Sequence, residues 1–208
     1  MQIKKLINLS MENHLYDEYL AIIEPDRTVK LDVIDMKTRC KNDYGWDSST
    51  PHFTVFNLIQ PTSNEKRLTK CFERNIVNIS PFQINLCGFD YFSKPTYTLY
   101  VKLKNEKQFS DMVRYIRKFC KPILKSVKDN PPHYNTKDAH LTIAKGISEL
   151  EFLKAWPSWE NLAYQSSTIA NRILLLKRPF TYANSKYEIV GKYPFLGQGP
   201  LDPQIALF

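Results

Sequence analysis

Hydrophobic and polar positions along the chain predict a recurring succession of strands and helices. Alternating or β-branched apolar segments predict strands at 19–24, 52–59, 82–92, 97–103 and 139–145. Apolar residues recur at helical spacing through 28–41, 64–79, 106–121 and 149–162. The segments 169–177 and 186–190 predict a closing pair of strands. Together these elements predict an α+β protein.

The two halves of the chain follow a similar plan. In each, a helix leads through a loop into a strand that carries His-x-Thr, and a further helix and a pair of strands follow. The repeat lies in the arrangement, with little residue identity. We expect a leader at 1–15, one bilobal unit at 16–195 and a tail at 196–208.

The His-x-Thr segments carry the chemistry that the sequence indicates. Side chains at i and i+2 of a strand share a face, so His52 and Thr54 point the same way, as do His140 and Thr142. If the two halves face each other, two imidazoles and two hydroxyls surround one groove. This set suits phosphate ester chemistry. A neutral imidazole takes a proton from the nucleophile, an imidazolium protonates the leaving oxygen, and the hydroxyls hold the phosphate oxygens.

The segments His52-Phe53-Thr54-Val55 and His140-Leu141-Thr142-Ile143 resemble the paired H-x-T/S-x motifs of the 2H phosphoesterases, the superfamily of 2′-5′ RNA ligase-like proteins and cyclic phosphodiesterases. The resemblance covers most of the chain, from about residue 16 to 195. It implies a bilobal α+β fold in which two antiparallel sheets, related by a pseudo-twofold axis, face a central cleft with helices outside. It also implies a metal-independent site where His52 and His140 act as acid and base and Thr54 and Thr142 bind phosphate. No cofactor is expected.

Three further residues are candidates for substrate binding. Lys145 stands five residues after His140, where ligase-like members often carry Arg. Strict alternation places Lys145 on the face opposite His140, unless a bulge intervenes. Tyr44 and Trp46 precede the first motif and are candidates for stacking on a nucleobase, with packing onto their own domain as the alternative.

Charge indicates a polyanionic partner. Among 208 residues, 29 are Lys or Arg and 21 are Asp or Glu, which gives a net charge of +8. The excess is larger in the second half of the chain, from which we expect most electrostatic guidance of an anionic substrate. Arg114, Lys118, Lys121 and Lys125 recur at helical spacing and form either an RNA-binding face or an ordinary solvated one. The hydrophobic and charged fractions, 43% and 24%, exclude wholesale disorder.

The remaining features concern the environment and the competing functions. Four widely spaced cysteines, with no signal peptide or membrane span in the sequence, predict a cytoplasmic protein, which we expect to be a monomer.

The preferred hypothesis is a phosphoesterase acting on 2′,3′-cyclic phosphate or 2′-5′-linked nucleotide or RNA substrates. One alternative is an RNA-end-binding or RNA-processing accessory protein without turnover. The weakest is a metal hydrolase with Asp138 as a ligand.

Overall fold

The computed structural model describes residues 15–46, 49–125, 127, 130–137, 139–180 and 185–199, in which strands and helices combine into an α+β fold. The strands are β1 (Tyr16–Ile23), β2 (Phe53–Pro61), β3 (Phe82–Phe92), β4 (Tyr97–Leu103), β5 (His133–Tyr134), β6 (His140–Ile147), β7 (Gln165–Ala170), β8 (Arg172–Pro179) and β9 (Glu188–Pro194). The helices are α2 (Arg27–Tyr44), α3 (Glu65–Asn75), α4 (Lys107–Cys120), α5 (Glu149–Ala155) and α6 (Pro157–Glu160). Short 3-10 turns occupy Thr62–Asn64, Ile76–Asn78 and Lys121–Ile123.

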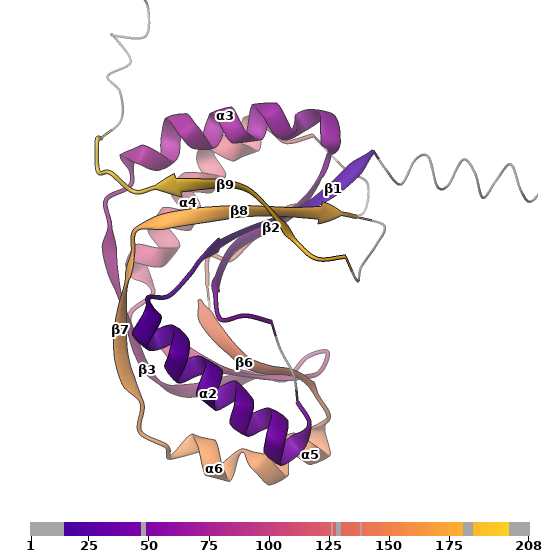
Figure 1. Cartoon of the computed structure of the whole chain (residues 1–208), viewed down its shortest axis with the longest axis vertical. Coiled ribbons are helices and arrows are strands. Elements are labelled where there is room, and N and C mark those ends of the chain that lie inside the picture. Colours follow the sequence, from indigo (N-terminus) through magenta and orange to yellow (C-terminus); the bar gives the residue numbers. More distant parts are fainter. Residues whose placement is uncertain are drawn as a thin grey trace, which may run out of the picture.

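The strands pair in the order β7-β3-β4-β6-β2-β1-β8-β9, and β5 adds to β2. All these pairs are antiparallel. We call β2-β1-β8-β9 the β2 half and β6-β4-β3-β7 the β6 half. Each half has its motif strand at the centre of the whole order, which is the expected pseudo-twofold arrangement. The two expected sheets meet through the register pair Phe53 and Leu141, so that they form one continuous, strongly curved sheet (Figure 1).

Helices cover the outer side of both halves, and two of them cross over (Figure 1). Helix α2 follows β1 of the β2 half but packs on β6 and β7. Its first turn is capped by Asp26, whose carboxylate accepts from the Val29 amide. Helix α4 follows β4 of the β6 half, yet its Phe109 packs against Phe53 of β2, with ring centroids 6.3 Å apart. Each half of the sheet is therefore completed by a helix that the other half supplies.

This topology corrects the expectation that the two halves of the chain are the two halves of the fold. The β2 half takes β1 and β2 from the beginning of the chain and β8 and β9 from its end, while the β6 half comes from the middle. The basic helix α4 packs over the β2 half. The positive charge of the second half of the chain is therefore divided between both halves of the sheet.

The closing pair predicted at 169–177 and 186–190 is the antiparallel pair of β8 and β9, but Ile169 and Ala170 belong to a separate strand, β7. β7 belongs to the β6 half and β8 to the β2 half, with Asn171 between them. Most of β7 was not predicted because residues 165–168 are polar, and its apolar Ile169 and Ala170 were joined to the apolar segment that follows them. Within the described part of the chain, no helix is long and apolar enough to cross a membrane. Of the expected leader at 1–15 and the expected tail at 196–208, residues 1–14 and 200–208 lie outside the described residues.

Candidate active site

The two His-x-Thr segments lie side by side in the middle of the sheet. His52 immediately precedes β2, and His140 is the first residue of β6. Phe53 and Leu141 form the register pair between the strands, and both are fully buried. In an antiparallel pair the flanking residues also lie opposite each other, so Thr54 lies across from His140, and His52 from Thr142. All four are half-buried. They therefore form one cluster on the sheet face opposite the core.

Each motif strand has a β-bulge directly after its Thr. In the pairing of β1 with β2, Ile22 matches Thr54 and Ala21 matches Phe56, which leaves Val55 as the extra residue. In the pairing of β4 with β6, Tyr100 matches Thr142 and Leu99 matches Ala144, which leaves Ile143 as the extra residue. The bulge therefore occupies the same position of both motifs, as the pseudo-twofold arrangement requires.

The bulges change which later side chains share the face of the site. Beyond each extra residue the alternation is shifted by one, so residues five positions after each His join the His-x-Thr face. In β6 this residue is the exposed Lys145, which pairs with Thr98 of β4. Thr142 pairs with Tyr100 of β4. Thr98 and Tyr100 are two positions apart and share a face, so Lys145 and Thr142 share that face too. The structure therefore brings Lys145 to the site face, against strict alternation. In β2 the equivalent residue is Asn57, which the sequence analysis missed, although its equal distance from His52 is a usable signal.

His52 is held in one tautomer. Its Nδ1 lies 2.7 Å from the carbonyl oxygen of Thr50, and since a carbonyl only accepts, Nδ1 carries the hydrogen. Burial lowers the pKa of His52, and the positive charges of Lys37, His140 and Lys145 lower it further, while the Thr50 carbonyl opposes them. His52 is therefore neutral at pH 7, with the lone pair on Nε2.

Lys37 joins the site from helix α2. Its Nζ donates to the carbonyl oxygen of Thr142 at 2.6 Å, so the helix that crosses to the β6 half places an ammonium beside the second motif. Lys37 was not among the site residues predicted from the sequence. No local pattern marks it, because its approach depends on how α2 packs.

Aromatic rings position His140. Its ring centroid lies 4.9 Å from that of Phe92 and 5.0 Å from that of Tyr100. Phe92 and His140 also line a cavity of about 360 Å³, and the rest of its wall comes from residues 133–137, the loop before β6. This pocket, which we call the loop pocket, lies directly beside one of the two imidazoles.

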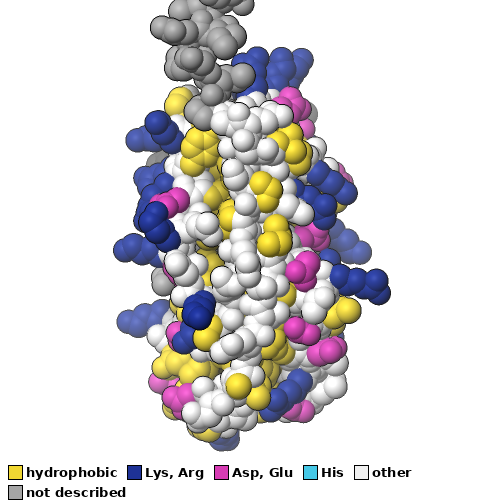
Figure 2. Space-filling model, turned by 90° about the vertical axis from the view of Figure 1, so that its left-hand side faces the viewer, with side chains coloured by type: hydrophobic (Ala, Val, Ile, Leu, Met, Phe, Trp, Pro, Cys, Tyr) yellow, Lys and Arg dark blue, Asp and Glu magenta, His cyan; other side chains and the backbone are white. Residues whose placement is uncertain are grey.

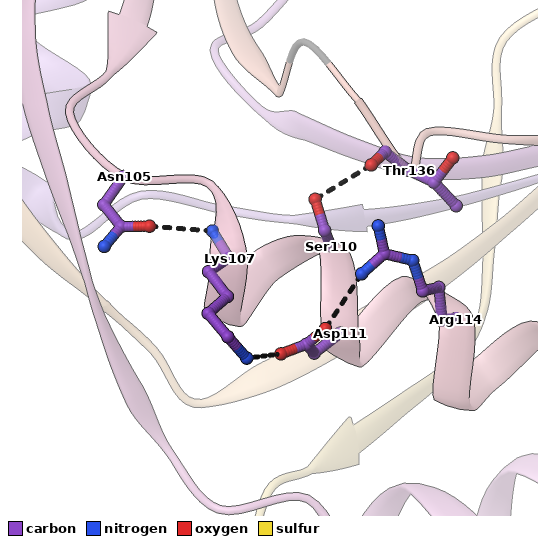
Figure 3. A network of polar contacts seen from close by, with 6 residues as sticks. All are labelled: Asn105, Lys107, Ser110, Asp111, Arg114 and Thr136. Atoms are coloured by element: carbon purple, nitrogen blue, oxygen red, sulfur yellow. Dashed lines mark hydrogen bonds and ion pairs between the residues drawn. The ribbon is translucent and has the colours of Figure 1, made fainter.

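The loop is fastened on both sides. Asn135 bonds to β2 twice, with its backbone amide donating to the Val55 carbonyl at 3.0 Å and its Nδ2 to the Thr54 carbonyl at 3.1 Å. On the other side, the Ser110 hydroxyl of α4 donates to the Thr136 carbonyl at 2.8 Å (Figure 3). The loop thus links α4, the first motif and the second motif.

Tyr44 and Trp46 stack on each other, with ring centroids 4.3 Å apart. Trp46 is only 8% exposed and belongs to the hydrophobic core. Its ring therefore has no free face for a nucleobase in this structure, and packing onto its own domain describes it better. Tyr44 remains half-buried.

The basic residues of α4 differ in their surroundings. Arg114 pairs with Asp111 at 2.9 Å (Figure 3), and Arg117 lies over the Tyr134 ring at 5.7 Å. One cation of α4, Arg117, therefore adjoins the loop at the site. The face at the left of Figure 1 shows Lys and Arg along both flanks, with no histidine of the described residues visible (Figure 2).

Asp138, the alternative metal ligand, lies outside the described residues. Among the residues that are described, no group of three or more His, Cys, Asp or Glu is placed to hold a metal ion.

The fold and the paired motif strands define a phosphoesterase-like α+β protein of the 2H class. A family model described as the 2′-5′ RNA ligase superfamily matches residues 25–179, and the chain belongs to that superfamily. This confirms the resemblance seen in the motifs. No curated protein sequence matches the chain.

Solved structures of low sequence identity share the fold. TT0787 of Thermus thermophilus is 12% identical with a TM-score of 0.61, and the match covers 87% of this chain and 99% of TT0787. Escherichia coli LigT complexed with 3′-AMP is 11% identical with a TM-score of 0.63, covering 86% of this chain and 98% of LigT. LigT complexed with phosphate is 11% identical with a TM-score of 0.62, covering 87% and 98%. At these identities the likeness concerns the fold alone.

Proposed function

We propose that this protein is a metal-independent phosphoesterase that acts on 2′,3′-cyclic phosphate or 2′-5′-linked nucleotide or RNA substrates by two-histidine acid-base catalysis. The observation that carries the proposal is the register pair Phe53 and Leu141, because it sets the half-buried His52, Thr54, His140 and Thr142 together on the sheet face away from the core. A protein that only packed these side chains has no need for both pairs to share one face away from the core.

For a 2′,3′-cyclic phosphate, the reaction needs one proton removed and one supplied. His52 accepts the proton of the attacking water through Nε2, and the water oxygen bonds to phosphorus. His140, as the imidazolium, gives its proton to the 3′ oxygen as the bond from phosphorus to that oxygen breaks. The products are a 3′ hydroxyl and a 2′-phosphate. The hydroxyls of Thr54 and Thr142 donate to the non-bridging oxygens, whose charge increases in the transition state.

His52 is assigned as the base because its tautomer and charge suit that role. The Thr50 carbonyl holds the hydrogen on Nδ1 and leaves Nε2 free to accept, and the lowered pKa keeps the ring neutral near pH 7. Lys145 stands on the same face, where its ammonium offers a further contact to an anionic substrate. The loop pocket beside His140 has a size and an aromatic wall, Phe92, that suit the nucleoside next to the phosphate. The structures of LigT with 3′-AMP and with phosphate support a ligand of this kind.

Two substrates test the proposal and the assignment of roles together. One is a nucleoside 2′,3′-cyclic phosphate. The other is a 3′-deoxynucleoside 2′-(p-nitrophenyl phosphate), whose leaving group departs as a stable anion and needs no proton. His52→Ala should lower kcat on both substrates by about 10²–10⁴-fold. His140→Ala should lower kcat similarly on the cyclic phosphate but by less than about tenfold on the nitrophenyl ester.

If His140→Ala lowers kcat on both substrates and His52→Ala lowers it only on the cyclic phosphate, the two histidines have the reverse roles. Full activity of both variants would refute the proposal. Thermal melting of each variant must show that the fold is kept. Salt-dependent binding of RNA ends by a wild-type protein that turns over neither substrate would instead favour the RNA-binding accessory function, for which the contact of Arg117 with the loop is the relevant observation.

A further inference from the structure

A second pocket lies on the site face of the β6 half. Its volume is about 660 Å³, and it is formed where β3 pairs with β7, next to the end of β4. Asn85 of β3 matches Ser167 of β7, and Cys87 matches Gln165. Ile84 and Leu86, which alternate with these residues on β3, are buried in the core. The side chains of Asn85 and Cys87 therefore point to the same side of the sheet as His140. We call this the amide pocket.

The register gives the distance between the amide pocket and the catalytic face. His140 of β6 matches Lys102 of β4, and Lys102 stands opposite the bulge that Cys87 and Gly88 form in β3. Because neighbouring strands are about 4.8 Å apart, Cys87 lies about 10 Å from His140 across the sheet, and Gln165 about 14 Å. An RNA strand that extends from the scissile phosphate in this direction places its second nucleotide at the amide pocket.

Lys102 bridges this distance. A Cβ placed on Gly88 would lie 3.9 Å from Cε of Lys102, so the lysine side chain runs over the glycine, from β4 towards β3. Gly88 also has a positive φ of 67°, a conformation that glycine adopts without strain. The bulge thus holds an ammonium between His140 and the amide pocket, where a backbone phosphate would lie.

Several polar side chains of the amide pocket have no partner among the residues that the structure describes. The side chains of Lys102, Lys104, Gln165 and Ser167 make no hydrogen bond or ion pair with any residue that the structure describes. Asn85 uses only its Oδ1, which accepts from Gln83 at 2.8 Å, and the Asn105 Oδ1 accepts from the Lys107 amide at 2.9 Å. Their Nδ2 groups remain available. Amides offer a donor and an acceptor together, which matches the edge of an unstacked nucleobase.

From this arrangement we propose that the amide pocket binds the base of a second nucleotide, with Lys102 on the phosphate between the two nucleotides. The preferred substrate is then an RNA strand of two or more nucleotides rather than a mononucleotide. This inference rests on the proposed function for the direction in which the strand leaves the site. Asn85 and Gln165 read the base, and Lys104 adds positive charge at the rim.

The test compares a nucleoside 2′,3′-cyclic phosphate with a tetranucleotide that ends in the same cyclic phosphate. Wild-type kcat/KM should be at least about tenfold higher for the tetranucleotide. Asn85→Ala/Gln165→Ala should reduce that ratio about tenfold, because two hydrogen bonds are lost. Lys102→Ala should reduce it too and flatten the dependence on salt. Asn161→Ala and Lys70→Ala, which replace an exposed amide and an exposed lysine elsewhere, are the matched controls.

Equal kcat/KM of the wild type for both substrates, or an unchanged ratio in the double variant, would overturn the inference. A binding measurement separates it from the proposed function. Fluorescence anisotropy with 3′-phosphorylated mono- and tetranucleotides should show tighter binding of the tetranucleotide, weakened about tenfold in Asn85→Ala/Gln165→Ala. If the wild type turns over neither cyclic substrate but this binding pattern holds, the pocket stands and the proposed catalysis fails. Equal binding of both lengths would refute the pocket.

Discussion

Replacing Asn135 by Ala probes the link between the loop before β6 and the first motif. The change removes the hydrogen bond from Nδ2 to the Thr54 carbonyl, 3.1 Å long, and keeps the bond from the Asn135 amide to the Val55 carbonyl. A lost side-chain hydrogen bond and a carbonyl left without its partner cost about 1–2 kcal/mol in the free energy of unfolding. For a chain of this length, that corresponds to a fall in Tm of about 2–8 °C.

Activity should fall as well, because Thr54 lies in the segment that Asn135 holds. A shift of the Thr54 hydroxyl by a fraction of an ångström is expected to lower kcat/KM on a cyclic phosphate by about ten- to a hundredfold. Thermal melting followed by circular dichroism gives the stability, and initial rates give kcat/KM. The control is Asn161→Ala, which removes an exposed side-chain amide that bonds to no described residue and should change stability by less than about 0.5 kcal/mol.

Two outcomes would refute this reasoning. If Asn135→Ala has the same Tm as the wild type, the hydrogen bond to Thr54 does not contribute to stability. If the variant is less stable but keeps full kcat/KM, the bond holds the loop without positioning the site.

Three further predictions address stability, pH and metals. Gln60→Ala should lower the free energy of unfolding by about 2–4 kcal/mol, because the buried Gln60 side chain bonds both the amide and the carbonyl of Lys125. Denaturation in urea measures this loss, and a change below about 1 kcal/mol would contradict the prediction. The acidic limb of the pH profile of kcat/KM should have its midpoint below 6.5, since the lowered pKa of His52 keeps the base neutral as the pH falls. A midpoint above 6.5 would argue against His52 as the base. Dialysis against excess EDTA should leave kcat unchanged, whereas a loss that Mg²⁺ or Zn²⁺ restores would argue for a metal enzyme.

Much of the fold could be predicted because the periodicity of apolar residues is local. The helix expected at 106–121 is α4, and the strands expected at 82–92 and 97–103 are β3 and β4. The helix expected at 149–162 is divided into α5 and α6 at Pro157, whose ring does not fit a continuous helix interior. Strand β7 was missed except for its last two residues, because residues 165–168 are polar and give no apolar periodicity.

The sequence by itself determined which residues carry the candidate chemistry. Alternation within a strand puts His52 beside Thr54 and His140 beside Thr142, whatever the rest of the chain does. The matching motifs in both halves also indicated that the pairs belong together. These inferences hold because they depend on residues two positions apart.

Tertiary structure alone decided how the pairs meet and what surrounds them. The register of Phe53 with Leu141 depends on strands distant in sequence, and the bulges that bring Lys145 and Asn57 to the site face arise from cross-strand pairing. Lys37 arrives only because α2 crosses to the β6 half. Local periodicity contains no information about such contacts, since they are selected by the packing of the whole sheet and its helices.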